Sequence, residues 1–280
     1  MKGRKITNQT IQSFEKHLIE NEKAKATIQK YLRDIHCFTR FVANRPLEKA
    51  LVLRYKESLE QKYAIRSANS MLAAMNAFLR FLGRFDLCVK QFKVQKETYC
   101  SEEKELSKAE YSSLVFAAEQ RKNKQLSLVV QTLCGTGIRV SELQCITVEN
   151  VRQGEAVVSC KSKTRKIFIV KALQKKLLRY ASEKGITSGV LFVTKKGKPL
   201  DRSNIWRQMK GLCEQAGVLP QKVSPHNLRH LFARTFYTIE KDLAKLADIL
   251  GHSNINTTRI YIITTGAEHQ RYMERMQLVM

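Results

Sequence analysis

Residues 224–261 read SPHNLRHLFARTFYTIEKDLAKLADILGHSNINTTRIY, and this stretch decides how the rest of the chain is interpreted. It opens with Ser-Pro, and serine is a good N-cap while proline suits the first position of a helix. Residues three and four apart are neighbours on a helix, so His226, Arg229 and His230 share one face. The stretch therefore predicts a helix that presents two histidines and an arginine together.

Two more polar side chains follow a second predicted helix. Residues 243–250 carry an apolar stripe at helical spacing, and Gly251 can end that helix. His252 comes next, and Tyr261 lies nine residues later. Side chains placed at helix starts and ends can converge on one pocket. None of these candidate groups is acidic, so the pocket suits a phosphate better than a metal ion.

The charge of the whole chain points to a polyanionic partner. At 280 residues, 43% of them apolar, the chain is long for one domain and can bury sizeable cores. Its 50 Lys and Arg outnumber 25 Asp and Glu, which gives a formal net charge of +25. Residues 1–96 carry 20 basic and 8 acidic side chains, and residues 97–280 carry 30 and 17. A polyanion held between two basic domains explains this balance better than a generally basic surface.

Composition disfavours several classes of protein. No apolar run approaches the 18 residues of a membrane span, and no apolar stretch follows the basic N-terminus as in a signal peptide. The seven cysteines are odd in number and lack C-x-x-C spacing. They predict reduced thiols rather than disulfides or a zinc site. We therefore expect a cytoplasmic protein without a membrane segment, a metal or a cofactor.

The first 86 residues predict a basic bundle of four helices. Apolar residues recur there in steps of three and four, with turn signals between the runs. The expected helices are 7–21, 25–43, 47–61 and 66–83. Residues 87–104 lose this period and become highly charged, which is typical of a linker. We therefore expect domains at 1–86 and 105–280.

The second domain mixes helices with one predicted hairpin. Ser107 and Glu110 form a capping box, and a glycine turn later leads to a short helix that starts at Arg139. Strands at 156–160 and 166–170 flank a polar turn. Further elements are expected as helices at 107–120, 124–134, 171–184, 202–216 and 267–280, with a short strand at 190–193. The predicted fold class is mainly α, with a helical N-terminal domain and an α+β domain that holds a small antiparallel sheet.

Six side chains suit chemistry on a phosphodiester: Arg139, Lys161, His226, Arg229, His252 and Tyr261. Two arginines can bind non-bridging oxygens and stabilise a phosphoryl transition state without a metal. A tyrosine hydroxyl is a weak nucleophile until a base or nearby cations activate it, and histidine can serve there. A lysine on a hairpin can protonate a leaving oxygen. Each signal alone has an ordinary structural interpretation, but their order and spacing together are specific.

The order is G-T-G-x-R-x-S-E-L, a basic hairpin, H-x-x-R-H, and L-G-H with a tyrosine nine residues after its histidine. In this pattern the chain resembles the tyrosine recombinases, or phage-type integrases, and especially their compact Xer-like members without an arm-binding domain. The resemblance implies a SAM-like core-binding domain that closes a clamp on DNA with the catalytic domain. It also implies that the six side chains form the active site, with Tyr261 as nucleophile. Glu142 would support the arginine, and His230 would be structural.

One position departs from the family pattern. The family lysine often lies in G-K-G-x-x-K-x-R, and both glycines are replaced here. Lys161 aligns best, and Lys163 is the alternative.

The resemblance implies site-specific recombination through a 3′-phosphotyrosyl intermediate, for integration or excision of a mobile element or for replicon resolution. It implies four protomers on two double-stranded DNA sites, assembled through a C-terminal helix, in the bacterial cytosol at the nucleoid. A type IB topoisomerase shares the chemistry without strand exchange, and a catalytically idle DNA-binding accessory protein is a third hypothesis. The presence of every motif residue argues against the third.

Overall fold

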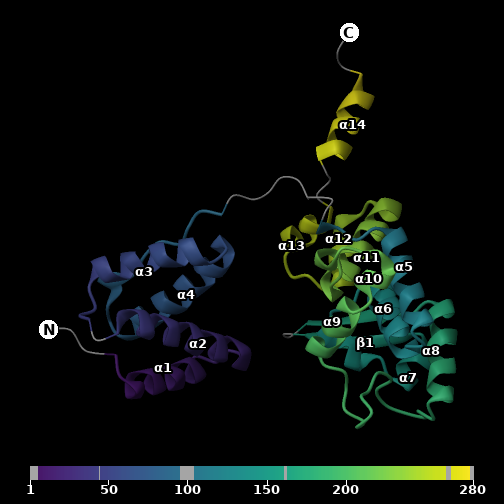
Figure 1. Ribbon diagram of the computed structural model, residues 1–280, viewed down its shortest axis with the longest axis horizontal. Coiled ribbons are helices and arrows are strands. Elements are labelled where there is room, and N and C mark those ends of the chain that lie inside the picture. The colour runs from purple at the N-terminus through teal and green to yellow at the C-terminus, as the bar shows by residue number, and fades with distance from the viewer. Residues whose placement is uncertain (1–5, 44, 95–103, 161–162, 263–265, 278–280) are drawn as a thin grey trace. The chain divides into compact units, whose positions relative to one another are not determined.

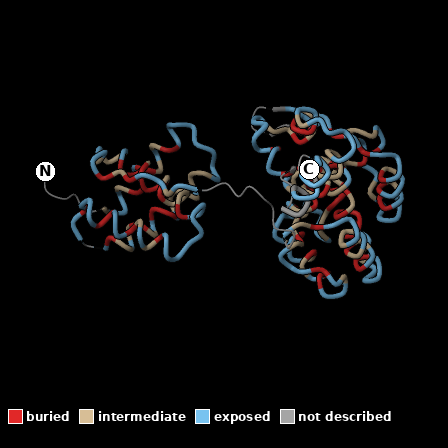
Figure 2. The backbone as a smooth tube through the Cα atoms, turned by 90° about the horizontal axis from the view of Figure 1, so that it is seen from above, coloured by how far each residue is buried: buried red, intermediate tan, exposed pale blue. Residues whose placement is uncertain are grey.

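The computed structural model describes residues 6–43, 45–94, 104–160, 163–262 and 266–277, and the chain divides into two compact units, 1–96 and 97–280. Figure 1 shows helices throughout both units and one small sheet in the second. Buried residues gather inside each unit, so each has its own core (Figure 2). The predicted class, mainly α with a small antiparallel sheet, is confirmed. Among the described helices, none combines the length and apolarity needed to cross a bilayer.

The N-terminal unit contains the four predicted helices, each within two residues of its expected ends. They are α1 (Asn8–Glu20), α2 (Lys25–Val42), α3 (Lys49–Lys62) and α4 (Ile65–Phe81), followed by the short 3-10 helix η1 (Phe85–Leu87). A Thr7 capping box starts α1. The apolar faces meet around Phe14, Phe38 and Phe78, which are fully buried. Their periodic spacing in the sequence is what made these helices predictable.

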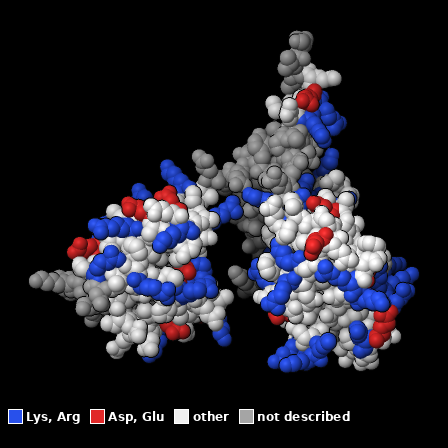
Figure 3. Space-filling model, viewed as in Figure 1, with Lys and Arg blue, Asp and Glu red and all other residues white. Residues whose placement is uncertain are grey.

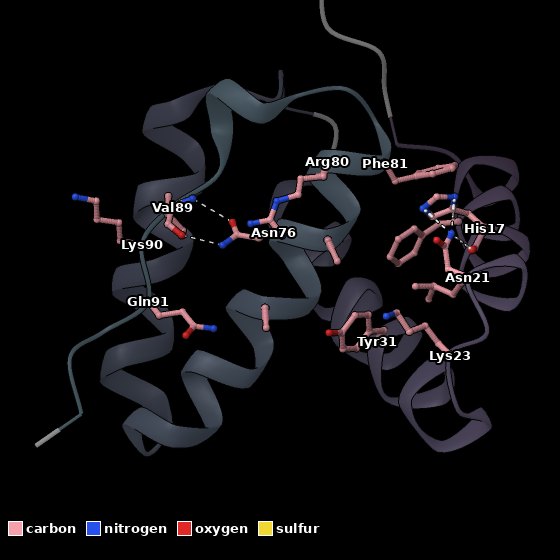
Figure 4. A pocket seen from close by; sticks show the side chains of 14 residues that line it. His17, Asn21, Lys23, Tyr31, Asn76, Arg80, Phe81, Val89, Lys90 and Gln91 are labelled. Carbon is pink, nitrogen blue, oxygen red and sulfur yellow. Dashed lines mark hydrogen bonds between the residues drawn. The ribbon is translucent and has the colours of Figure 1, made fainter. Parts of the chain in front are cut away.

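Two asparagines of α4 bind the segment that follows the bundle. The Asn76 side chain donates to the Val89 carbonyl at 2.8 Å and accepts from the Val89 amide at 3.0 Å (Figure 4). Asn69 makes the same pair of bonds to Phe92, at 2.9 and 2.8 Å. The predicted linker therefore begins with residues that are bonded to the N-terminal unit, and residues 95–103 lie outside the described part of the chain.

A cavity of about 960 Å³ opens beside these residues in the N-terminal unit. Its polar and basic lining includes His17, Asn21, Lys23, Arg80 and Lys90 (Figure 4). None of the candidate catalytic residues that the structure describes lines it.

The second unit packs helices around α6 (Lys124–Thr136), which contacts α5 (Lys108–Gln120), α8 (Lys171–Glu183) and α11 (Pro225–Glu240). The predicted Ser107–Glu110 capping box starts α5. The other helical elements are η3 (Val140–Cys145), α7 (Val148–Gln153), α9 (Arg202–Lys210), α10 (Cys213–Ala216), η4 (Pro220–Lys222), α12 (Leu243–Leu250), α13 (Ile255–Arg259), η5 (Ile260–Ile262) and α14 (Gly266–Met276).

The sheet is a two-stranded antiparallel hairpin, but the predicted turn was too long. Strand β1 (Glu155–Cys160) pairs with β2 (Lys163–Phe168), and the register runs from Glu155 opposite Phe168 to Cys160 opposite Lys163. The prediction placed residues 163–165 in the turn because they are polar. They extend the strand instead, and Arg165 in β2 is held by a buried carboxylate on another element.

Two other local predictions were wrong. Residues 190–193 do not form a strand; they make isolated bridges, Thr147 to Val190 and Val193 to Pro199. The helix expected at 202–216 breaks into α9 and α10 at Gly211, the residue of that run with the weakest helical preference.

Candidate active site

Helix α11 carries the H-x-x-R-H motif as the sequence predicted. The Ser224 hydroxyl accepts from the Asn227 amide at 3.1 Å, and Pro225 occupies the first turn. His226 Nε2 lies 3.2 Å from His230 Nε2, and the two rings meet edge to face. Because both histidines and Arg229 come from the first two turns of α11, the helix start fixes their spacing.

Arg229 is the buried centre of the site, with 3% of its surface exposed. One guanidinium nitrogen donates to the Gly137 carbonyl at 2.6 Å, where α6 ends in a left-handed turn. The other donates to the Leu250 carbonyl at 2.7 Å, where α12 ends, and contacts His252 Nε2 at 3.0 Å. Three helices therefore meet at one guanidinium group.

The glycines at these helix ends allow neighbouring side chains to pack closely against the backbone. Gly137 and Gly251 both have positive φ, and a Cβ on Gly137 would lie 2.4 Å from the Phe232 ring. A Cβ on Gly251 would lie 2.8 Å from the Arg165 side chain. The glycine signals in the sequence thus mark close packing around the arginines as well as helix ends.

Tyr261 is buried against the same group. Its ring stacks on His252 at 5.6 Å and meets His230 edge to face at 4.3 Å between centroids. Burial and the Arg139 charge lower the pKa of Arg229, while a hydrogen bond from Arg229 to the Tyr261 hydroxyl opposes that change. The tyrosine hydroxyl therefore lies beside the Arg229 guanidinium.

His252 is neutral at pH 7, and its tautomer follows from its partners. Burial, followed by the charges of Arg229 and Arg139, lowers the pKa of His252 to about 4. Its Nε2 accepts from Arg229, so Nδ1 carries the proton and donates to the Thr258 hydroxyl at 2.8 Å. Thr258 is fully buried in α13. The sequence analysis did not select this threonine, which fixes the ring.

Glu142 ties two arginines together. Its carboxylate accepts from the Arg139 backbone amide at 2.8 Å and from the Arg139 guanidinium at 3.0 Å. It also takes two bonds from Arg165, at 3.0 and 2.7 Å. Burial raises the pKa of Glu142, but the bonds from Arg165 and from the Arg139 backbone outweigh it and hold the pKa at about 2.

Arg165 is a site residue that the sequence analysis missed. Besides binding Glu142, it donates to the Ile249 carbonyl at 3.0 Å and so joins β2 to α12. Alternate residues of a strand share a face, so Arg165 lies on the same face of β2 as the buried Ile167. This alternation could have predicted that Arg165 points inward, but the sequence analysis placed Arg165 in the turn.

We expect Glu142→Gln to lower the free energy of unfolding of the second unit by about 3 kcal/mol at pH 7, the usual cost of breaking a buried ion pair. The folded-state pKa of Glu142 lies below its ordinary value of 4.5. Its contribution is therefore present above pH 4.5 and is lost as pH falls towards 2. Urea unfolding at pH 7 and at pH 4 measures the change. Trp206, the one tryptophan, reports on this unit.

Glu155→Gln is the matched control for this measurement. Glu155 also pairs with a cation of β2, Lys166 at 2.9 Å, but both side chains are exposed. Exposed pairs contribute less than about 1 kcal/mol. Equal effects of the two substitutions would contradict the structural importance of Glu142.

The described residues bring together Arg139, Glu142, His226, Arg229, His230, His252 and Tyr261, as the sequence suggested. Lys161 lies outside the described residues, and Lys163 is placed only as the first residue of β2. Within the described ranges, no group of three or more His, Cys, Asp or Glu is arranged to hold a metal ion. The constellation offers fixed cations, histidines and one tyrosine hydroxyl to a phosphate.

Comparison with known proteins agrees with this chemistry. Residues 104–267 match the phage integrase family, and residues 11–84 match the N-terminal SAM-like domain of phage integrases. The chain belongs to the phage integrase family. The tyrosine recombinase XerA of Pyrococcus furiosus is 28% identical over all of this chain and 98% of its own length. XerD of Vibrio cholerae is 28% identical over 89% of this chain and 87% of its own.

Solved structures of other phage integrases share the fold. The Tn1549 transposon integrase in complex with transposon right end DNA has a TM-score of 0.71 at 16% identity, covering 96% of this chain and 99% of that one. A lambda integrase tetramer bound to a Holliday junction has a TM-score of 0.73 at 18% identity, covering 90% and 76%. Together with the Xer relatives, the family supports site-specific DNA recombination as the activity of this integrase. A type IB topoisomerase and an idle accessory protein are not favoured.

Proposed function

We propose that Tyr261 is the nucleophile of this recombinase and that DNA is cut and rejoined at the group of side chains around Arg229. The observation that carries the proposal is the position of buried Tyr261, whose ring stacks on His252 and whose hydroxyl bonds to Arg229, the arginine that also contacts His252. A tyrosine hydroxyl is a weak nucleophile until a base takes its proton, and histidines can serve as that base. An isolated tyrosine would lack such neighbours.

The proposed reaction consists of two transfers of the same phosphoryl group. Tyr261 Oη attacks the scissile phosphorus as the bond to the 5′ oxygen breaks, and the tyrosine proton passes to a histidine. The leaving 5′ oxygen takes a proton from Lys161. A 3′-phosphotyrosyl link and a free 5′-hydroxyl result. The 5′-hydroxyl of a partner strand then attacks the link, restores the phosphodiester and returns the tyrosine.

Arg139 and Arg229 stabilise the charge that builds on the non-bridging oxygens. Both lie next to carbonyl or carboxylate groups that hold their guanidinium planes before DNA arrives. Fixed cations of this kind need no rearrangement during the reaction, and such electrostatic stabilisation is usually the largest contribution to catalysis. Glu142 acts by holding Arg139, and Arg165 by holding Glu142.

His226 and His252 are the candidates for moving the tyrosine proton and contacting the phosphate. Burial, with the charges of His230, Arg229 and Arg202, lowers the pKa of His226. Both rings are therefore neutral near pH 7, where a neutral imidazole can accept a proton on one nitrogen and donate from the other. His230 touches both His226 and Tyr261 and serves to place them.

Double-stranded DNA is the proposed substrate. Lys and Arg side chains spread over the visible face of each unit and outnumber the acidic ones (Figure 3). Lys and Arg side chains bind DNA phosphates, which gives affinity without sequence specificity. We assign residues 1–86 to a core-binding domain, 87–104 to a linker and 105–280 to the catalytic domain with its assembly helix.

The lambda integrase structure on a Holliday junction suggests that four protomers of this chain act on two DNA sites. The Tn1549 relative suggests integration or excision of a mobile element, with replicon resolution as the Xer-like alternative. Because the substrate is DNA, the proposed location is the bacterial cytosol at the nucleoid.

Two supercoiled plasmids test the proposed reaction. One carries two copies of the DNA that flanks this reading frame, and the other carries none. We expect recombinant circles only from the first and unchanged supercoiling of the second. Progressive relaxation of the site-free plasmid, without strand exchange, would instead favour a topoisomerase.

A further inference from the structure

A half-buried carboxylate next to the linker contacts the active-site histidine His230, and the reaction described above does not use it. Glu105 lies two residues after the segment 95–103 and before α5, and only 13% of its side chain is exposed. Its Oε1 lies 3.6 Å from His230 Nδ1, and its Oε2 accepts from Arg234 at 2.9 Å. Both partners lie on α11, 125 or more residues further along the chain.

His230 carries this contact into the site. Its Nδ1 edge faces Glu105, and its Nε2 lies 3.2 Å from His226 Nε2. Its ring also meets the Tyr261 ring edge to face at 4.3 Å. Glu105 thus touches one side of a ring whose other sides touch the two residues that we assign to proton transfer and nucleophilic attack.

The carboxylate is ionised throughout the working range of pH. Its contact with His230 is the largest influence that lowers the pKa of Glu105, burial opposes it, and Arg234 adds to it, so that the pKa lies at about 2. An ionised carboxylate can only accept, so its place beside Nδ1 favours the His230 tautomer with the proton on that nitrogen. The ring is then fixed in one orientation, with Nε2 towards His226.

We propose that Glu105 is a positioning residue for strand cleavage. Its carboxylate orients the His230 ring, which in turn holds the side chains of His226 and Tyr261 in position. The inference rests on the roles proposed above for those two residues. It adds to the site a group that comes from the chain next to the linker. In the same way, carboxylates that orient metal-bound histidines affect activity without touching the substrate.

The charge of Glu105 also reaches His226. The groups that lower the pKa of His226 after burial are His230, Arg229 and Arg202, and Glu105 is the group that raises it. Tyr261 faces the same ring at 5.9 Å and is a further titratable neighbour in the described part of the chain. Removing the negative charge therefore lowers the pKa of His226 further.

Glu105→Gln in the full chain tests the proposal, because it keeps the size and an acceptor oxygen but removes the charge. The measurement is the rate of covalent complex formation on a nicked DNA site between pH 5 and pH 9. We expect the plateau rate to fall about 10- to 100-fold, the scale of lost outer partners of functional histidines. Because the neutral form of His226 is the active one, the acidic limb of the profile should move to lower pH. DNA affinity should not change.

Arg234→Met is the matched control. Both substitutions remove the ion pair between Arg234 and Glu105, but Arg234→Met leaves the contact between Glu105 and His230 in place. We expect its pH profile to match that of the wild type. If Arg234→Met reproduces both effects of Glu105→Gln, the ion pair is merely structural and the proposal is overturned. An unchanged rate and profile for a folded Glu105→Gln would also overturn it.

A second readout separates this inference from the proposed chemistry. Residual cleavage by Glu105→Gln should still link DNA to Tyr261, as peptide mapping of the covalent complex can show. A link to another residue would remove the proposed nucleophile, whereas a link to Tyr261 at an undiminished rate would remove only the role of Glu105.

Discussion

Tyr261→Phe will abolish covalent protein–DNA complexes, a loss on the order of a millionfold in cleavage rate, as when other enzymes lose a nucleophile. The substitution deletes the hydroxyl beside Arg229 and leaves every cation in place. Affinity for DNA, measured by electrophoretic mobility shift, should therefore stay within a few-fold of the wild type. The ring contacts with His230 and His252 do not involve the hydroxyl, so the fold should be retained at a cost of about 1 kcal/mol.

Tyr237→Phe provides the control for this experiment. Tyr237 packs against the same apolar cluster as Tyr261, which is formed by Ala233, Leu246 and Leu250. It makes no contact with the active-site histidines among those described, so it should cleave at the wild-type rate. Cleavage of a nicked substrate by Tyr261→Phe would show that another residue is the nucleophile.

Much of this site was predictable because its elements are local in sequence. Ser224, Pro225 and the spacing from His226 to His230 lie within two turns of one helix, where capping and the helical repeat determine the geometry. Arg139 and Glu142 are likewise three residues apart. The predicted helix end at Gly251 is also a local signal, and it is confirmed, whereas the helix expected to end at residue 134 continues to Thr136 and turns at Gly137.

The contacts of the residues that the sequence analysis missed depend on long-range packing. Arg165 reaches Glu142 across 23 residues and Ile249 across 84, and its polarity suggested a turn rather than a strand. Glu105 stands in a charged run that resembles a solvated linker, yet it contacts α11. Periodicity within one element carries no information about such partners, because the contact depends on how separate elements pack.

The identity of the general acid leads to the second large effect. Attack by Tyr261 expels a 5′ alkoxide, a poor leaving group near neutral pH unless a proton reaches it as the bond breaks. Arg229 is committed to carbonyls and His252, and an arginine does not readily release a proton. Lys161, which follows β1 in the sequence, is therefore our candidate. Lys161→Ala should slow cleavage by about a hundred- to ten-thousandfold, the usual range for acid–base catalysis.

A bridging 5′ sulfur in place of the oxygen distinguishes proton donation from charge stabilisation, because a thiolate leaves without a proton. We expect this substrate to restore cleavage by Lys161→Ala but not by Arg139→Ala or Arg229→Ala, which lose stabilisation of the non-bridging oxygens. Lys163→Ala is the matched control, two residues away at the start of β2. Rescue of Lys163→Ala alone would transfer the role to that lysine. The sulfur substrate can rescue only a variant that has lost the proton donor. If it rescues neither lysine variant, neither lysine is the donor and the general acid lies on another element.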